Sequence, residues 1–232
     1  MKIYNIRGVD IVSIRTRREL IEYAAEQKKS LIAVNAEKIL HADEQFKDLI
    51  NSNIGYPDGA GAVFALRRKG FKDAIKIPGC ELWLDIVSHF YKTKSFYLVG
   101  AKQEIIEATV KKINTEYSGI NIVGYRNGYI ESDSEKAALV EDIKLKQPDI
   151  VFIAMGSPKQ ELLMQDLQAV NPAIYQGLGG SFDVYIGTVT RAPERWVRNN
   201  LEWAYRLIRQ PWRIKRQIHL VKFFWWVVIN KL

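Results

Sequence analysis

The feature that most constrains this chain is a regular alternation of short apolar runs with amphipathic stretches. Strands are predicted at 31–34, 96–99, 121–124, 150–154 and 173–177. Most of these runs have no polar alternation, as in strands that are buried on both faces. Helices are predicted between them, at 36–51, 60–68, 81–91, 102–117, 133–146 and 158–170. The pattern predicts an α/β fold with a Rossmann-like, mostly parallel sheet and helices on both faces.

Charge divides the chain into two parts near residue 190. Residues 191–232 contain ten Lys or Arg and two Glu, whereas residues 1–190 contain 24 basic and 24 acidic residues. The net charge of +8 therefore belongs to the last 42 residues, which also contain five of the six tryptophans. We interpret residues 1–190 as an α/β catalytic domain and residues 191–232 as a basic, Trp-rich helical appendage that associates with a membrane.

The appendage has the composition of an element that lies on a bilayer. Arg206, Arg209, Arg213 and Arg216 recur at helical spacing, which places them on one face if the helical phase continues through Pro211. Residues 223–229 read FFWWVVI, far fewer than the roughly 20 residues needed to span a bilayer. Arginine beside aromatic residues suits the surface of an anionic membrane, so Arg209, Arg216, Trp225 and Trp226 are predicted membrane contacts.

Several classes of protein are disfavoured. A single cysteine, Cys80, excludes an internal disulfide and favours the reducing cytosol. The first 20 residues contain no uninterrupted apolar segment, so no signal peptide is expected. The chain has no Asp-x-Asp and only three histidines, so we expect no metal and no cofactor. Two glycine loops, GAGAVF and GLGGSF, both lack the last glycine of GxGxxG, which disfavours a dinucleotide site.

Two loops in the first half follow or precede predicted elements and carry polar residues. Asn35 comes directly after a strand, where its amide suits a ligand oxygen or, equally, the start of the next helix. Asp58 lies in a Pro-Asp-Gly turn, and a carboxylate there suits a general base towards a hydroxyl. Gly59 and Gly61 open the next helix, whose N–H groups suit a phosphate; a plain turn is the alternative.

Two further loops lie in the second half. At 154–161, AMGSPKQE, a strand ends in Gly156 and Ser157, with Lys159 and Gln160 as polar groups over the edge of the sheet. The alternative is a plain strand-to-helix turn capped by Ser157. At 177–183, GLGGSFD, the backbone of Gly179 and Gly180 allows close approach of a ligand, and Asp183 suits ribose hydroxyls. The alternative for Asp183 is a helix cap.

Taken together, these motifs resemble the WecG/TagA/CpsF family of bacterial glycosyltransferases, glycosyltransferase family 26. The resemblance runs from about residue 3 to the C-terminus. The segments that carry it are VNAEKIL, PDGAGAV, FYLVGAK, NIVGYRNGY, AMGSPKQE, GLGGSFDVYIG and RAPERW, followed by LEWAYRLIRQP and RIKRQ. NAEKIL, RAPERW and RIKRQ are most similar to members that transfer N-acetyl-D-mannosaminuronate in the synthesis of enterobacterial common antigen.

The resemblance implies an inverting, metal-independent transfer at the cytoplasmic face of the bacterial inner membrane by a peripheral enzyme. The implied donor is UDP-N-acetylmannosaminuronate, and the implied acceptor is N-acetylglucosaminyl-diphospho-undecaprenol. It assigns the general base to Asp58 and active-site roles to Asn35 and Gln160. It also implies that Arg206 and Arg213 act at the active site. Members acting in teichoic acid synthesis often carry Thr where this chain has Ala33, so no hydroxyl role is carried over to that position.

Other functions stay open on the sequence. The same fold is compatible with transfer of N-acetylmannosamine or another hexose from UDP to a lipid-linked acceptor. From a different class, the basic tail suits nucleic acid or a non-catalytic membrane scaffold. We do not expect a nucleic-acid partner, because FFWWVVI has no role on a duplex and residues 1–190 contribute no basic excess. The sequence is compatible with a homo-oligomer.

Overall fold

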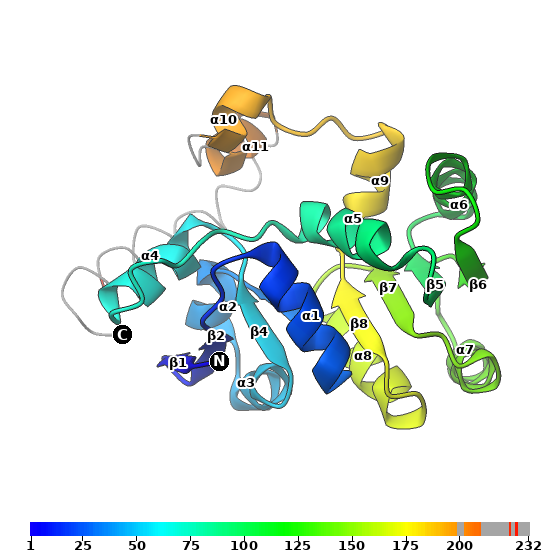
Figure 1. Cartoon of the computed structure of the whole chain (residues 1–232), viewed down its shortest axis with the longest axis horizontal. Coiled ribbons are helices and arrows are strands. Elements are labelled where there is room, and N and C mark those ends of the chain that lie inside the picture. The colour runs from blue at the N-terminus through cyan, green and yellow to red at the C-terminus, as the bar shows by residue number, and fades with distance from the viewer. Residues whose placement is uncertain (199–201, 210–222, 224–225, 227–232) are drawn as a thin grey trace. The chain divides into compact units, whose positions relative to one another are not determined.

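The structure, a computed structural model, describes residues 1–198, 202–209, 223 and 226. For Arg198, Trp203, Arg206 and Arg209 the description is limited to the backbone. The predicted α/β fold is confirmed: six strands form one parallel sheet in the order β4-β3-β8-β7-β5-β6 (Figure 1).

The six strands of the sheet comprise the five predicted strands, whose bounds agree closely with the apolar runs, and one strand at 54–57 that was not predicted. They are β3 Leu31–Val34, β4 Ile54–Pro57, β5 Ser95–Gly100, β6 Asn121–Arg126, β7 Ile150–Ala154 and β8 Ile174–Gly177. All residues of β4, β7 and β8 are buried, which explains why their sequences show no polar alternation. β8 begins one residue later than predicted, at Ile174, whose N–H donates to the carbonyl of Asp149.

Three short strands escaped the sequence analysis: β4 in the parallel sheet and the first two strands of the chain. β1 Ile3–Ile6 and β2 Val9–Val12 form an antiparallel hairpin. Its two turn residues, Arg7 and Gly8, have φ of +55° and +86°, the left-handed backbone that a two-residue hairpin turn requires. Asn51 ties the hairpin to the following helices, because it accepts from the Asp10 N–H and donates to the Gly8 carbonyl.

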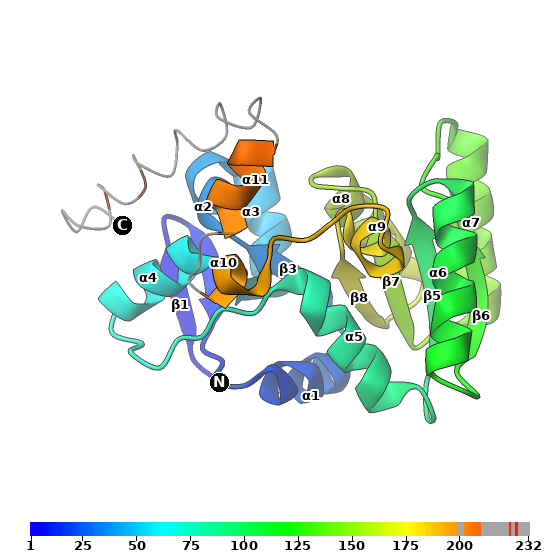
Figure 2. The same ribbon diagram turned by 90° about the horizontal axis from the view of Figure 1, so that it is seen from above.

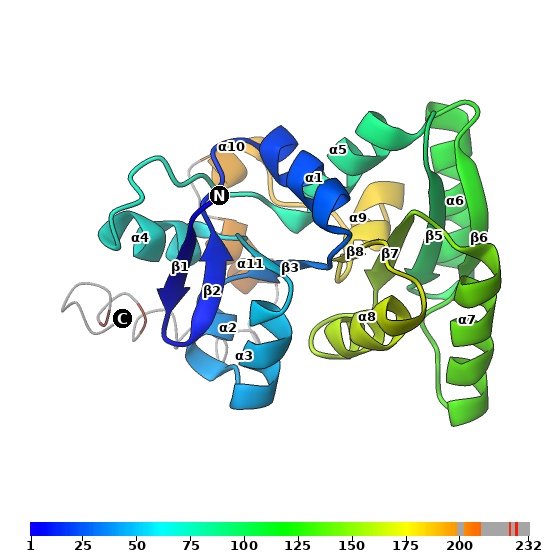
Figure 3. The ribbon, with the colours of Figure 1, turned by 60° about the horizontal axis from the view of Figure 1, so that its bottom comes forward.

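Helices connect the strands and cover the sheet. Their bounds are α1 Arg17–Gln27, α2 Ala36–His41, α3 Glu44–Asn51, α4 Ala60–Arg68, α5 Gly79–Phe90, α6 Gln103–Glu116, α7 Asp133–Lys146, α8 Lys159–Val170, α9 Ser181–Ile186, α10 Glu194–Arg198 and α11 Glu202–Arg209. The chain runs from β5 outward to β6 and then back to β7. Right-handed crossovers therefore place α6 and α7 on opposite faces of the sheet, alongside β5 and β6 in Figures 2 and 3.

Capping explains where the predicted helices were right or wrong. α7 starts as predicted because Ser132 and Glu135 form a capping box. The single helix predicted at 36–51 is wrong: Asp43 accepts from the Phe46 N–H and starts a second helix there. Similarly, α8 begins at Lys159 rather than at 158, because Pro158 occupies the cap position and no side chain caps this helix.

The chain divides into two compact units. Unit 1 comprises Met1–Thr16, Ala33–Pro78 and Thr190–Leu232, and unit 2 comprises Arg17–Ile32 and Gly79–Val189. Unit 2 has an aromatic core in which Trp83 packs edge-on against Phe152, Phe182 and Tyr185. The fully buried side chains of unit 1 include Ile6, Ile11 and Tyr56.

Candidate functional site

In unit 1 the structure brings Asn35, Asp58 and Gly59 together. The Asp58 N–H donates to the Val34 carbonyl at 2.9 Å, which joins the end of β4 to the end of β3. A Cβ atom built on Gly59 would lie 3.9 Å from the Cβ of Asn35, so the two loops are in van der Waals range. Asp58 as a residue is partly exposed. The loops that carry Asp58 and Asn35 thus lie next to each other, and a carboxylate in such a place suits proton transfer from a bound hydroxyl.

Asn35 also has a local structural role. Its Oδ1 accepts from the Lys38 N–H at 3.0 Å and caps α2, as the plain alternative predicted. Because the oxygen is used in this cap, the amide nitrogen is the part of Asn35 suited to donate to a ligand oxygen. A helix cap and a ligand contact are therefore compatible in one side chain.

Two glycines open α4 for different reasons. Gly59 caps this helix with φ of +121° and ψ of 157°, a conformation that is essentially limited to glycine. Gly61 is buried, and a Cβ there would lie 2.9 Å from the Cβ of Ala36 and 3.2 Å from the Phe223 ring. Close packing of α2 and Phe223 against α4 thus gives Gly61 a structural role. The predicted contact between Gly61 and the sugar donor is a separate role that this packing does not test.

Unit 2 contains the other two predicted loops. After β7, Gly156 has φ of +81°, and Ser157 and Lys159 are exposed. Gln160 lies in the first turn of α8 and is only 6% exposed. Its Oε1 accepts from the N–H groups of Gly156 at 3.1 Å and Gly179 at 2.9 Å. The structure therefore brings the loop after β7 and the loop after β8 together through this one side chain.

The loop after β8 is glycine-rich and open. Gly179 has φ of +57°, and a Cβ on Gly179 or Gly180 would meet no atom within 4 Å. Asp183 lies in α9, where its carbonyl accepts from Thr188 Oγ1 at 3.0 Å and from the Val189 N–H at 3.2 Å. Asp183 as a residue is partly exposed, which is compatible with the predicted contact to a ribose.

Two residues that the motifs did not single out take part in this arrangement. Glu161 is 1% exposed and accepts from Gln160 Nε2 at 3.0 Å. Gly177 ends β8, and a Cβ there would lie 2.4 Å from Gln160 Nε2. An acidic residue directly after Gln160 was visible in the sequence. Its burial was not, because Glu is normally exposed.

The appendage is described in part. The backbones of Arg206 and Arg209 lie in α11, whereas the side chains of both, and the whole of Arg213, Arg216 and Trp225, lie outside the described residues. Phe223 is fully buried, and the Arg7 guanidinium lies 4.1 Å from the ring centre of Trp226. Trp226, a predicted membrane contact, thus also contacts the hairpin turn of unit 1.

Neither a membrane span nor a metal cluster occurs in the described part of the chain. No helix there is long and apolar enough to cross a bilayer. No three or more His, Cys, Asp or Glu side chains there are grouped so as to hold a metal ion.

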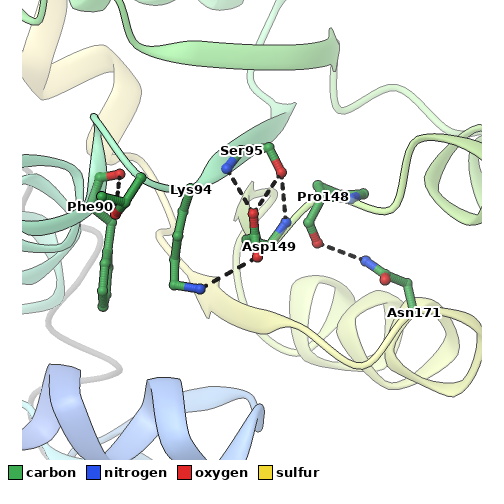
Figure 4. Close-up of polar contacts among 7 residues, drawn as sticks. Phe90, Lys94, Ser95, Pro148, Asp149 and Asn171 are labelled. Atoms are coloured by element: carbon green, nitrogen blue, oxygen red, sulfur yellow. Dashed lines mark hydrogen bonds and ion pairs between the residues drawn. The ribbon is translucent and has the colours of Figure 1, made fainter.

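A small cavity of about 140 Å³ lies at the other end of the strands of unit 2. Lys28, Lys94, Asp149 and Asn171 are among its lining residues. Asp149 accepts from the Ser95 N–H and Oγ, both at 2.9 Å, and pairs with Lys94 at 3.4 Å (Figure 4). Because these contacts join the starts of β5 and β7, we assign the cavity a structural role.

Asp149 supplies a test of stability against pH. Burial of its carboxyl opposes ionisation, but the hydrogen bonds from Ser95 and the charge of Lys94 outweigh burial and lower the pKa. Because the pKa of Asp149 is lowered in the folded state, its ionised carboxylate stabilises the fold above the unfolded-state pKa of about 3.9. This stabilisation is lost as the pH falls through the folded-state pKa. Asp149→Asn should therefore lower the urea midpoint at pH 7, and the difference from the wild type should shrink at pH 3.

A matched control is Glu141→Gln, which removes an exposed carboxylate 3.6 Å from Lys144. Exposed pairs of this kind contribute little, so its midpoint should stay close to that of the wild type. Equal midpoints for Asp149→Asn and the wild type at pH 7 would contradict the assignment.

One comparison with known proteins covers the whole chain. The family model described as "Glycosyl transferase WecG/TagA/CpsF family" matches residues 1–232.

Proposed function

The chain belongs to the WecG/TagA/CpsF family of glycosyltransferases, and on that premise we propose that it transfers a sugar from a UDP-sugar donor to a lipid-linked acceptor. The match along all 232 residues is the observation that carries the proposal. The position of Asp58 at the end of β4, where its N–H bonds the Val34 carbonyl of β3, supports it, because transfer to a hydroxyl needs a base.

The finer proposal concerns the two substrates. The donor is UDP-N-acetyl-D-mannosaminuronate, and the acceptor is N-acetylglucosaminyl-diphospho-undecaprenol, an intermediate of enterobacterial common antigen. The support is the similarity of NAEKIL, RAPERW and RIKRQ to the members with this specificity. A donor with a uronate carboxylate also calls for a cationic partner, and the appendage is rich in arginine.

The proposed reaction is a single displacement with inversion. The Asp58 carboxylate accepts the proton of the acceptor hydroxyl while its oxygen attacks the anomeric carbon of the donor. The bond from that carbon to the UDP oxygen breaks on the opposite face, and UDP leaves with both bonding electrons. Arg206, Arg213 and backbone N–H groups stabilise the charge on the departing diphosphate.

The remaining roles follow from the glycine loops and the appendage. We assign donor binding to Gly59, Gly61, Gly156, Ser157, Lys159, Gly179, Gly180 and Asp183. The appendage holds the enzyme at the cytoplasmic face of the inner membrane through Arg209, Arg216, Trp225 and Trp226. This assignment is supported by the concentration of the net charge and five tryptophans in residues 191–232.

The decisive experiment is a donor panel with a synthetic lipid-diphospho-N-acetylglucosamine acceptor. The full-length protein is incubated with UDP-linked N-acetylmannosaminuronate, N-acetylmannosamine, N-acetylglucosamine and glucose, and the lipid product is measured. Transfer from the uronate donor at least tenfold faster than from the others supports the finer proposal. Faster transfer from N-acetylmannosamine would overturn the uronate assignment and keep the enzyme class. No transfer from any donor would contradict the proposed function.

Transfer should also proceed without a divalent metal. The motivation is the absence of Asp-x-Asp, the motif that commonly holds a metal on a UDP-sugar. The rate in excess EDTA should equal the rate in buffer with added magnesium. A loss of activity in EDTA that magnesium or manganese restores would refute this prediction.

A further inference from the structure

Gln160 uses both ends of its side chain inside unit 2. Its Oε1 accepts two hydrogen bonds, from Gly156 and Gly179, and its Nε2 donates one to Glu161 Oε1. The side chain is 6% exposed, and Glu161 is 1% exposed. A primary amide offers two donors and one acceptor oxygen, so this oxygen is fully occupied by protein N–H groups.

The two N–H groups come from loops that follow neighbouring strands. β7 and β8 pair in parallel, with Ile153 opposite Gly177, and the Leu178 N–H donates to the Ile153 carbonyl. Beyond these last ladder contacts, the Gln160 oxygen continues the connection between the two chain segments. It therefore sets the separation of the Gly156 and Gly179 backbones where the sheet no longer does.

Glu161 determines which way the amide of Gln160 faces. Its carboxylate oxygen accepts from Nε2, and an ionised carboxylate is an acceptor only. A flipped amide would place its oxygen against this carboxylate and its NH₂ group against two N–H donors. The Glu161 contact thus favours the orientation in which Oε1 faces both glycines.

Gly177 makes room for this arrangement. A Cβ at residue 177 would lie 2.4 Å from Gln160 Nε2 and 2.8 Å from Cδ, closer than atoms approach in proteins. By contrast, a Cβ at Gly156, Gly179 or Gly180 would meet no atom within 4 Å. The first glycine of GLGGSF is therefore required by the side chain of Gln160, a contact unrelated to any ligand.

We propose that Gln160 is a positioning residue that holds the loops after β7 and β8 at a fixed separation for the donor diphosphate, with Glu161 orienting its amide. In this role Gln160 does not contact the substrate. The link to the donor rests on the proposed function, whereas the clamp between the loops stands on the hydrogen bonds alone.

The first arm of the test measures the clamp in the ligand-free protein. Gln160→Met keeps a side chain of similar length and removes all three hydrogen bonds. Amide hydrogen exchange at Gly156 and Gly179, followed by NMR, should become at least about tenfold faster, because a hydrogen bond to each amide is lost. The control is Gln168→Met on the same helix, whose side chain bonds Ser30 and Lys28 instead. It should leave both glycine amides unchanged.

The second arm uses a swap of the pair. In Gln160→Glu with Glu161→Gln, the carboxylate at 160 accepts from both glycines, and the amide at 161 donates to it. Slow amide exchange at Gly156 and Gly179 should return in the swapped protein.

The kinetic readout uses a UDP-sugar and a soluble acceptor. The kcat/KM for the donor should fall about tenfold or more in Gln160→Met and return to within about threefold of the wild-type value in the swap. The KM for the acceptor should not change.

The outcomes separate the proposal from its rivals. Unchanged exchange in Gln160→Met would overturn the clamp. Faster exchange with unchanged kcat/KM would overturn its role in donor binding. A swap that restores exchange and stays inactive would show direct substrate contact, since a carboxylate facing a diphosphate repels it. No transfer by the wild type would contradict the proposed function, while the exchange results would still decide the clamp.

A second pair of variants covers the case in which Gln160→Met does not fold. Gly177→Ala should displace the Gln160 amide and accelerate exchange at Gly156 and Gly179 in the native background. In the Gln160→Ala background, Gly177→Ala should not accelerate this exchange further, because the side chain with which the new Cβ would clash is absent. Equal effects of Gly177→Ala in both backgrounds would also overturn the proposal.

Discussion

Asp58→Asn is expected to lower the rate of transfer by about 100- to 10,000-fold, the usual loss when a general base is removed. Asparagine keeps the shape of the side chain but cannot accept the proton of the acceptor hydroxyl. The N–H of residue 58 still bonds the Val34 carbonyl, so the loop and UDP binding should be preserved. Turnover numbers at saturating substrates and calorimetric titration with UDP measure the two effects.

The matched control for this variant is Asp43→Asn in the same unit. Asp43 caps α3 through a bond from the Phe46 N–H, and asparagine caps helices equally well. The control should keep wild-type activity and thermal stability. If Asp58→Asn keeps most of its turnover number, Asp58 is not the base.

Trp83→Ala is expected to destabilise the protein by about 3–5 kcal/mol, as for other large aromatic residues removed from a core. Trp83 is fully buried and packs against Phe152 of β7 at 5.6 Å and against Phe182 and Tyr185 of α9 at 5.6 and 5.1 Å. Since whole domains have about 5–15 kcal/mol of stability, this loss is a large fraction of the total. Guanidinium unfolding followed by circular dichroism measures it.

Trp83→Phe is the companion variant. Among the described residues the Trp83 indole N–H has no hydrogen-bond partner, so phenylalanine removes volume without removing a hydrogen bond. Trp83→Phe should lower the free energy of unfolding by clearly less than Trp83→Ala does. Because Phe182 directly follows the glycine loop, Trp83→Ala should also weaken donor binding before global unfolding. A loss below about 1 kcal/mol for alanine would contradict the packing argument.

An element can be predicted from the sequence where its own residues carry the apolar pattern or the capping residues that define it. The run 150–154 is apolar at every position, and β7 has these same bounds. The helix at 133–146 matches α7 because its capping box lies within four consecutive residues. The β1–β2 hairpin was missed because its strands have four residues each and include Asn5 and Asp10, which strands disfavour.

The candidate site divides in the same way. The sequence alone was sufficient to predict which loops are candidates for chemistry, because Pro-Asp-Gly at Asp58 and the glycines near Gln160 are recognisable from residue type and spacing. It also determined that Asn35 suits a helix cap, since the Lys38 N–H that it accepts from is three residues away.

Only the tertiary structure decided which distant groups these residues meet. Gly179 lies 19 residues from Gln160, and the bond between them exists because β7 and β8 are neighbours in the sheet. Gly61 packs against Phe223, which is far along the chain, and the Asp58 N–H meets the Val34 carbonyl because β4 lies beside β3. Residue type determines what a side chain can bond, but the order of strands determines its partner. A buried polar group must take whichever donor or acceptor the fold places beside it.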